Sequence, residues 1–304
     1  MRNLFIVDVF AERRYAGNQL AVVVSKEPIA PEEMQAIAEE MNYSETTFVS
    51  SGPEAVVGNE ASFAVRIFTP TQELPFAGHP ILGTGAVLRD HVLAEPASSL
   101  TLITGIGPIP LRFEEDNCAD LRVWMRPGVP TLGDSMARGK AAALLGLSPD
   151  ELHPLHDPIA AAIGIGFILV PLASTSALDR VSFDLTGWRA LRASGLDAIG
   201  IFAFVEQAQT EGNDLAARMF FDAGGAREDP ATGSANTCLA GWLASTRPIP
   251  ESGLCLRVEQ GVAMGRPSII HLGISRGASN ADSPAAPSIE VGGGVILSVK
   301  GELV

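Results

Sequence analysis

Apolar and polar residues alternate over several short segments of the chain, beginning with residues 3–10. A period of two, with many β-branched and aromatic residues, is typical of β-strands. The same pattern predicts further strands at 20–25, 46–50, 62–69, 100–104, 108–115, 120–127, 167–174, 199–207, 214–222, within 254–275 and within 287–304. We therefore expect a structure built mainly from β-strands joined by short turns.

Helices are fewer. Residues 30–41 predict one, because Pro31 stands near its first turn and acidic residues follow at its positive end. Residues 188–195 predict a short one. Two further helices, at about 80–88 and within 233–245, are apolar nearly all round. A helix without a polar face suggests enclosure by a curved sheet rather than packing on a flat one.

The longest uncharged run is 158–178, and its apolar centre, 159–173, contains Gly164, Gly166 and Pro171. That centre is shorter than the ~18 apolar residues that suggest a membrane span. We interpret the run as a turn followed by a buried strand.

One pattern occurs twice. E-x-P-x-x-G stands at 73–78 and again at 228–233, each time before an apolar helix and after an Arg-apolar-Phe strand, at 66–68 and 218–220. Two copies of one unit suggest gene duplication and two similar domains related by a pseudo-twofold axis, although so short a match also arises by chance. Glu73 and Glu228 are expected to brace the two turns and to interact with helix-start N–H groups, and Arg66 and Arg218 are expected to pair with nearby acids.

Composition and net charge limit the kinds of molecule that the protein is expected to bind. With 304 residues, 46% of them hydrophobic, the chain can bury a large core. A net charge of −14 argues against nucleic acid and anionic membranes as partners. Three cysteines without C-x-x-C spacing, and no signal-peptide core before Asp8, predict a reduced, cytoplasmic protein.

Candidate binding and catalytic groups lie at or near the repeated turn. Unpaired N–H groups at a helix start attract anions, so two such starts would suit a small carboxylate. Glu45, His79 and Asp229 add titratable groups of the kind that move a proton on a carbon acid. Each also has an ordinary structural interpretation: a strand-start carboxylate for Glu45, a cap or core histidine for His79, and an Asx-turn residue for Asp229. Ser234 is likewise a plausible helix cap.

Other patterns are weaker. His153 and His156 resemble a metal-binding pair, but their segment is broken by prolines and favours a surface loop. No G-x-S-x-G elbow, complete dinucleotide loop or P-loop pattern is present.

Five stretches in order along the chain resemble the PhzF-like family, a group of phenazine biosynthesis isomerase-related proteins. They are DVFAERRYAGNQLAVV, NYSETTFV, FTPTQELPFAGHPILGTG, AREDPATGSANTCLAGW and VEQGVAMGRPS. The resemblance implies the α+β diaminopimelate epimerase fold, with two similar domains that each wrap a curved, mostly antiparallel sheet around a central helix. It also implies cofactor-independent isomerase chemistry in a cleft between the domains, often in a homodimer.

The resemblance also implies roles for individual residues. Glu45 is expected to be the general acid/base, with His79 and Asp229 assisting it. The substrate is expected to be held by the backbone N–H groups of Gly78 and Gly233. The side chains of Asn18, Ser44 and Ser234 are expected to contact it as well. The chain departs from the family at Ala16 and Gln19, where the turn usually reads G-G-N-P, and at Ala77, where some relatives carry cysteine.

That last departure bears on the mechanism. Epimerases of this fold commonly use two facing thiols, whereas Cys238 lies one helical turn beyond Ser234. The sequence therefore favours a proton shift by one glutamate over a racemisation that uses two thiols. Two rivals stay open: an amino-acid epimerase or racemase with a second base, and a non-catalytic protein that binds a small acid.

From these features we expect a first domain of residues 1–124 plus 289–304 and a second of 125–288. We expect a cofactor-independent isomerase of a small carboxylic acid, with no metal. The sequence does not identify the substrate.

Overall fold

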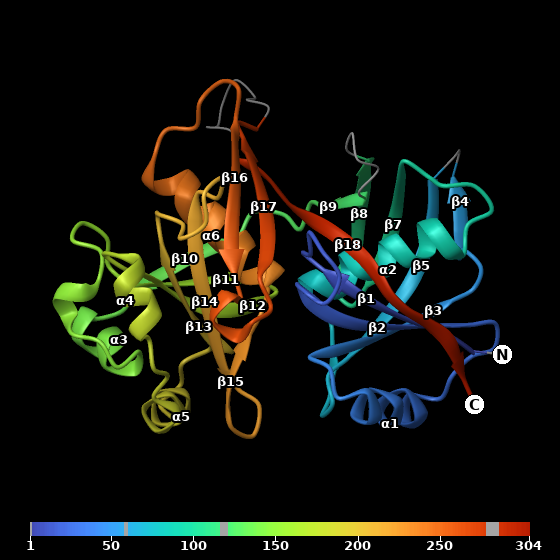
Figure 1. Cartoon of the computed structure of the whole chain (residues 1–304), viewed down its shortest axis with the longest axis horizontal. Coiled ribbons are helices and arrows are strands. Elements are labelled where there is room, and N and C mark those ends of the chain that lie inside the picture. The colour runs from blue at the N-terminus through green and yellow to red at the C-terminus, as the bar shows by residue number, and fades with distance from the viewer. Residues whose placement is uncertain (1, 58–59, 116–120, 278–285) are drawn as a thin grey trace. The chain divides into compact units, whose positions relative to one another are not determined.

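The computed structural model describes residues 2–57, 60–115, 121–277 and 286–304. Cys118 and the first residue of the strand expected at 120–127 lie outside these residues. So does most of 275–288, a stretch whose low hydrophobicity predicts a loop. The chain divides into two compact units (Figure 1). Unit 1 runs to Arg126 and includes Gly292–Val304, and unit 2 covers Pro127–Val291.

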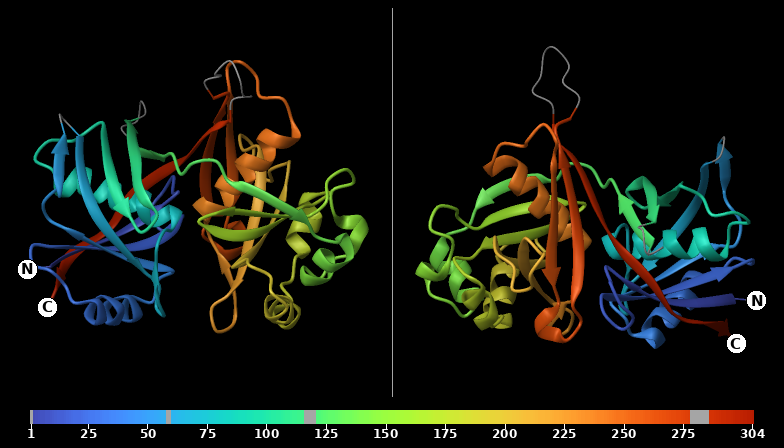
Figure 2. Two further views of the ribbon diagram at one scale, coloured as in Figure 1. Left: turned by 180° about the vertical axis from the view of Figure 1, so that it is seen from behind. Right: turned by 45° about the horizontal axis from the view of Figure 1, so that its top comes forward.

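Unit 1 contains two helices and most of the N-terminal strands. Its elements are β1 (Arg2–Val9), β2 (Asn18–Ser25), α1 (Pro31–Met41), β3 (Glu45–Ser50), β4 (Ala55–Val57), β5 (Glu60–Phe68), β6 (Glu73–Leu74), α2 (Gly78–His91), β7 (Ser99–Thr104), β8 (Gly107–Glu115), β9 (Leu121–Met125) and the main part of β18 (Ser288–Leu303). The chain ends lie side by side because Arg2 pairs with Leu303 (Figure 2).

The sheet of unit 1 closes on itself. Its strands pair in the order β9–β8–β7–β5–β3–β2–β1–β18, and β18 also pairs with β9. The pairs β5–β7 and β2–β3 are parallel and the other pairs in this series are antiparallel. The result is the curved, mostly antiparallel sheet expected from the sequence.

Unit 2 repeats this plan with helices added at its edge. Its elements are β10 (Thr131–Ser135), α3 (Arg138–Leu144), η1 (Pro149–Glu151), β11 (Ile159–Ile163), β12 (Ile165–Pro171), α4 (Thr175–Arg180), α5 (Leu185–Ala193), β13 (Gly200–Val205), β14 (Leu215–Asp222), β15 (Ala226–Asp229), α6 (Gly233–Thr246), β16 (Leu254–Gln260), η2 (Val262–Met264) and β17 (Ser268–Ser275). Its strands pair in the order β10–β11–β12–β13–β14–β16–β17, which corresponds to β18–β1–β2–β3–β5–β7–β8 in unit 1. In both units the third and fifth pairs of this order are parallel and the other four are antiparallel.

Each sheet surrounds one apolar helix. Helix α2 contacts β1, β2, β3, β7 and β9, and α6 contacts β10, β11, β12 and β17 (Figure 1). The first eleven residues of each helix, 78–88 and 233–243, are buried all round. Close packing needs glycine here: a Cβ at Gly83 would lie 2.6 Å from the Leu20 side chain, and one at Gly241 would lie 2.3 Å from the Pro130 ring. The prediction of two enclosed helices is confirmed.

The repeated E-x-P-x-x-G motif forms the same hairpin in both units. Phe68 pairs with Glu73 between β5 and β6, and Phe220 pairs with Glu228 between β14 and β15. Arg66 and Arg218 pair with acids as expected, and the acids are Glu73 and Glu228, each held by a bidentate ion pair. Each guanidinium also lies over the phenylalanine of its own strand, at 5.1 and 4.8 Å from the ring centroid.

Parts of the sequence-based prediction were wrong. The expected turn at the start of 158–178 is strand β11, joined to β12 by Gly164 with a φ of 72°. Helix α2 begins at Gly78 and ends at His91, so it is longer than the expected 80–88. Among the described residues, no helix is long and apolar enough to cross a membrane.

Candidate active site

The first cluster of functional side chains lies at the start of α2 in unit 1. His79 is the second residue of this helix, and Ala77 at its N-cap offers no side-chain hydrogen bond. Pro80 follows and has no N–H group. The amide groups of the first turn, Gly78 included, are therefore not capped by a side chain, and a substrate anion can take that position.

The His79 ring connects two other residues expected at the site. Its Nε2 atom lies 3.4 Å from Oε2 of Glu45, and its Nδ1 atom lies 3.3 Å from Nδ2 of Asn18. His79 is 5% exposed and Glu45 15% exposed at the side chain, so both are largely shielded from water. The structure thus brings Asn18, His79 and Glu45, three of the expected site residues, together at the start of α2.

The imidazole of His79 is neutral at physiological pH. Burial lowers the pKa of His79 from 6.5 to about 3, and a hydrogen bond with the backbone of Gln19 opposes that shift only in part. A neutral ring carries one N–H and one acceptor nitrogen. His79 therefore lies between Asn18 and Glu45 without adding a positive charge, and the 3.4 Å contact of its Nε2 with Oε2 of Glu45 is not an aligned hydrogen bond.

Local backbone geometry presents Glu45 and Asn18. Helix α1 ends at Met41, and the left-handed conformation of its C-cap residue Asn42 (φ 52°) turns the chain toward β3, of which Glu45 is the first residue. Ser44, immediately before it, is half-buried. Gly17 precedes Asn18 with a φ of 69°, and a Cβ there would lie 2.4 Å from the carbonyl oxygen of Val9. The family-like turn at 16–19 therefore still depends on glycine at its second position.

The second cluster lies at the start of α6 in unit 2. Asp229 ends β15 with 9% exposure, and its Oδ2 accepts a hydrogen bond of 2.5 Å from the hydroxyl of Thr232, the N-cap residue. That hydroxyl does not cap the helix, so the amides of Gly233 and Ser234 are left uncapped by a side chain, as at α2. Ser234 is 3% exposed.

A glutamine that sequence reasoning overlooked supports this second cluster. Gln260, at the end of β16, bonds to the backbone of Asp229, to Thr232 and to Asn236. Gln260 stands in the VEQG stretch of the family-like pattern, but neither its residue type nor its spacing indicated a role.

The strand registers show how the two units differ in chemistry. Thr46 of β3 pairs with Phe68, and Ile201 of β13 pairs with Phe220, the equivalent phenylalanine. Glu45 in unit 1 therefore corresponds to Gly200 in unit 2. A Cβ at Gly200 would lie 2.6 Å from the carbonyl oxygen of Phe220, so this position holds no side chain.

The same register relates the helix starts. His79 corresponds to Ser234, each directly after the glycine of the repeated motif. Asp229 corresponds to Leu74, since each follows the bracing glutamate. In unit 2 the positions that correspond to Glu45 and His79 thus hold Gly200 and Ser234, and the candidate carboxylate, Asp229, lies at a different strand position.

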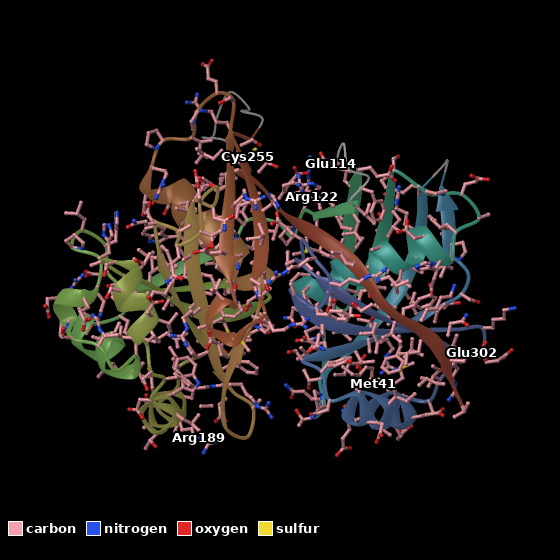
Figure 3. The ribbon with its side chains drawn as sticks, viewed as in Figure 1. Met41, Glu114, Arg122, Arg189, Cys255 and Glu302 are labelled. Atoms are coloured by element: carbon pink, nitrogen blue, oxygen red, sulfur yellow. The ribbon has the colours of Figure 1, made fainter. Side chains whose placement is uncertain are left out.

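Cysteine and histidine candidates elsewhere do not add to these clusters. Burial raises the pKa of the Cys238 thiol to about 12, so it is protonated at neutral pH, and Cys255 is exposed on β16 (Figure 3). The rings of His153 and His156 stack at 4.8 Å, and His156 packs edge-on against Trp242. Among the described residues, no group of three or more His, Cys, Asp and Glu could hold a metal ion.

Comparisons with known proteins match the whole chain. A family model described as phenazine biosynthesis-like protein matches residues 7–301. A trans-2,3-dihydro-3-hydroxyanthranilate isomerase from Pseudomonas fluorescens is 38% identical over 276 residues, which cover 89% of each chain. An isomerase of that name from Pseudomonas chlororaphis is 36% identical over 100% of both chains.

Solved structures show the same fold. A PhzF-family phenazine biosynthesis protein from Bacillus anthracis superposes with a TM-score of 0.87 at 24% identity, covering 100% of this chain and 99% of the other. A probable proline racemase from Agrobacterium radiobacter superposes with a TM-score of 0.66 at 11% identity, covering 100% and 93%. The fold expected from the sequence, α+β and diaminopimelate epimerase-like, is confirmed.

Proposed function

Because this chain belongs to the phenazine biosynthesis-like family and is an isomerase, we propose that it moves a proton between two carbons of a small carboxylic acid with Glu45 as its single acid/base. The observation that carries the proposal is the contact of Glu45 with a buried, neutral imidazole, at 3.4 Å. A carboxylate in this setting can accept a proton and return it.

The reaction balances without a co-reactant. The ionised Glu45 takes a proton from a carbon next to an unsaturated or carboxylate-bearing group, and the electron pair is delocalised into that group. Protonated Glu45 then delivers a proton to a different carbon of the same molecule, and before delivery this proton can exchange with water. Substrate and product have the same formula, so neither an oxidant nor a cofactor is consumed.

His79 and the helix starts assist in this proposal. If the Asn18 amide donates to Nδ1 of His79, the ring proton lies on Nε2, which faces Glu45. The contact of Nε2 with Oε2 of Glu45, at 3.4 Å, helps to hold the carboxylate in place. Backbone amides of Gly78 and Gly233, with Ser44 and Ser234, bind the substrate, and Asp229 of unit 2 contacts it in the same reaction.

The asymmetry of the two units favours one base over two. A racemase of the two-base type needs a second proton acceptor, and Gly200 at the position corresponding to Glu45 has no space for one. The thiol of Cys238 is protonated at neutral pH. Proton transfer from one carbon to another by a single residue requires neither.

The proposal is tested by incubating the protein with trans-2,3-dihydro-3-hydroxyanthranilate, the substrate in the name of two relatives, and with pools of other unsaturated cyclic acids and amino acids. Proton NMR would follow the products. We expect isomerisation of at least one cyclic acid, unaffected by gel filtration and a chelator. Inversion of an amino acid instead would favour a racemase, and tight binding without any conversion would favour a binding protein.

A further inference from the structure

The Gln260 side chain is at the centre of the hydrogen bonds around Asp229. It lies at the end of β16 with 1% exposure. Its Nε2 donates to the carbonyl oxygen of Asp229 at 2.9 Å and to Oγ1 of Thr232 at 3.1 Å. Its Oε1 accepts from the backbone N–H of Thr232 at 3.3 Å and from Nδ2 of Asn236 at 3.0 Å.

Two backbone groups fix which way the Gln260 amide points. The backbone N–H of Thr232 can only donate, so the atom facing it must be the amide oxygen. The carbonyl of Asp229 can only accept, so the atom facing it must be the amide nitrogen. The usual ambiguity between the two ends of a glutamine amide is therefore absent here.

This orientation decides where the Thr232 hydroxyl proton goes. Oγ1 of Thr232 already accepts an N–H from Gln260, and its own proton is directed at Oδ2 of Asp229, 2.5 Å away. If Asp229 were protonated on Oδ2, two protons would compete for this contact. The arrangement thus stabilises the carboxylate in its ionised form.

We propose that Gln260 is a positioning residue that acts through Thr232 to keep Asp229 ionised and aimed as a hydrogen-bond acceptor. This inference rests on the proposed function only in assigning Asp229 to the substrate. It implies that the substrate presents a donor group, such as an amine or a hydroxyl, to Asp229. Asp229 would then orient that group rather than supply a proton.

Two carboxylates close to Asp229 and Gln260 in sequence are engaged in other contacts. Glu228, next to Asp229, is held by Arg218 of β14. Glu259, next to Gln260, accepts hydrogen bonds from the backbone of Gln209 and Thr210. The buried part of α6, residues 233–243, contains no charged residue. The Thr232 hydroxyl is the donor to Asp229 that the test below removes.

The test is a carboxylate titration that needs no substrate. Protein labelled with ¹³C at aspartate side chains would be titrated by NMR, and the Asp229 signal identified by its loss in Asp229→Asn. Thr232→Val keeps the shape of the residue and removes the hydroxyl, whereas Thr232→Ser restores it. We expect the Asp229 midpoint to rise by about one pH unit in Thr232→Val, a tenfold effect that fits one charge-assisted hydrogen bond.

Two further variants separate positioning from general loosening. Gln260→Met removes the amide, and we expect a smaller upward shift because the hydroxyl is no longer held in one orientation. Asn236→Leu removes a neighbouring donor that does not reach the Asp229 carboxylate, and we expect no shift. Equal shifts in Thr232→Val and Asn236→Leu, or a wild-type midpoint in Thr232→Val, would overturn the inference.

The same variants distinguish this inference from the proposed function. If the wild-type enzyme converts a substrate, the acid limb of its kcat/KM profile should move upward in Thr232→Val and return in Thr232→Ser. The expected NMR shifts without any conversion would retain the role of Gln260 and contradict the proposed function. Conversion of a substrate without any shift of the Asp229 midpoint would support the proposed function and contradict the role of Gln260.

Discussion

Nε2 of His79 lies 3.4 Å from Oε2 of Glu45, while Nδ1 of the same ring faces Asn18 at 3.3 Å. The ring is buried and neutral, so its single proton can serve only one of these neighbours at a time. The side chain of Asn18 and the backbone of Gln19 therefore both bear on the tautomer, and the tautomer decides whether Glu45 meets an N–H or a lone pair. Control of Glu45 begins at Asn18, 27 positions earlier in the chain.

Asn18→Asp tests this control. A carboxylate at position 18 would attract the ring proton to Nδ1, so that Nε2 presents a lone pair to Glu45. We expect kcat to fall by about 10²-fold, in the range of one lost acid/base contact, with a smaller change in KM. Imidazole ¹⁵N NMR would report the tautomer directly. An Nδ1–H ring in the wild-type protein would refute the assignment.

His79 should also make the protein sensitive to acid. Its pKa is about 3 in the folded state and near 6.5 when unfolded, so between these values the unfolded state binds the extra proton. Stability is therefore complete above pH 6.5 and is lost as pH falls toward 3. The slope is at most about 1.4 kcal/mol per pH unit, which gives a loss of about 2 to 3 kcal/mol between pH 6.5 and 4.5.

Urea unfolding of wild type and His79→Gln at those two pH values measures this term. We expect the variant to lose about 2 kcal/mol less than wild type between them. His91→Gln is the control, because His91 is exposed and its removal should leave most of the acid sensitivity. Equal acid sensitivity in wild type and His79→Gln would mean that His79 is protonated in the folded state.

The two bracing ion pairs offer a matched comparison within one chain. Glu228 and Arg218 are 14% and 15% exposed at their side chains, whereas Glu73 and Arg66 are 42% and 37% exposed. Glu228→Gln should cost about 2 to 3 kcal/mol of unfolding free energy, because it leaves a shielded guanidinium without its carboxylate. Glu73→Gln should cost less than about 1 kcal/mol, because water replaces the lost contact.

Urea denaturation of the two variants tests this ranking. Arg218 keeps its hydrogen bonds to the carbonyls of Leu178 and Val181, which should hold the loss below that of a fully buried pair. A larger loss in Glu73→Gln than in Glu228→Gln would show that burial does not decide the strength of these pairs.

Much of the fold was predictable because its signals are local. The strands alternate visibly, the two enclosed helices lack a polar face, and the Arg-apolar-Phe and Glu positions recur with the same hairpin register. The wrong predictions fall where these local signals are weak. The segment 159–163 has few polar residues to show alternation, and Gly164 suggested a longer turn than the one residue it supplies. Helices α3 and α4 are short and were not assigned from the sequence.

The candidate site also contains residues that local motifs predicted and features that depend on the folded structure. Glu45, His79 and Asp229 stood out because they are titratable residues inside family-like motifs. The neutral state of His79 depends on burial and could not be read from its neighbours in sequence. Gln260 contacts Thr232 across 28 positions and carries no titratable group, so no motif pointed to it. The expected homodimer and the shared use of one substrate by both units remain predictions.

Carbon-bound proton exchange in D2O tests the role of Glu45 most directly. Wild-type protein, Glu45→Gln and Glu40→Gln would be incubated with trans-2,3-dihydro-3-hydroxyanthranilate, and proton NMR would follow the loss of carbon-bound signals. Glu40 is an exposed residue of α1 and supplies the same substitution outside the site. We expect exchange in wild type and Glu40→Gln and a loss of at least about 10³-fold in Glu45→Gln. Undiminished exchange in Glu45→Gln would contradict Glu45 as the base.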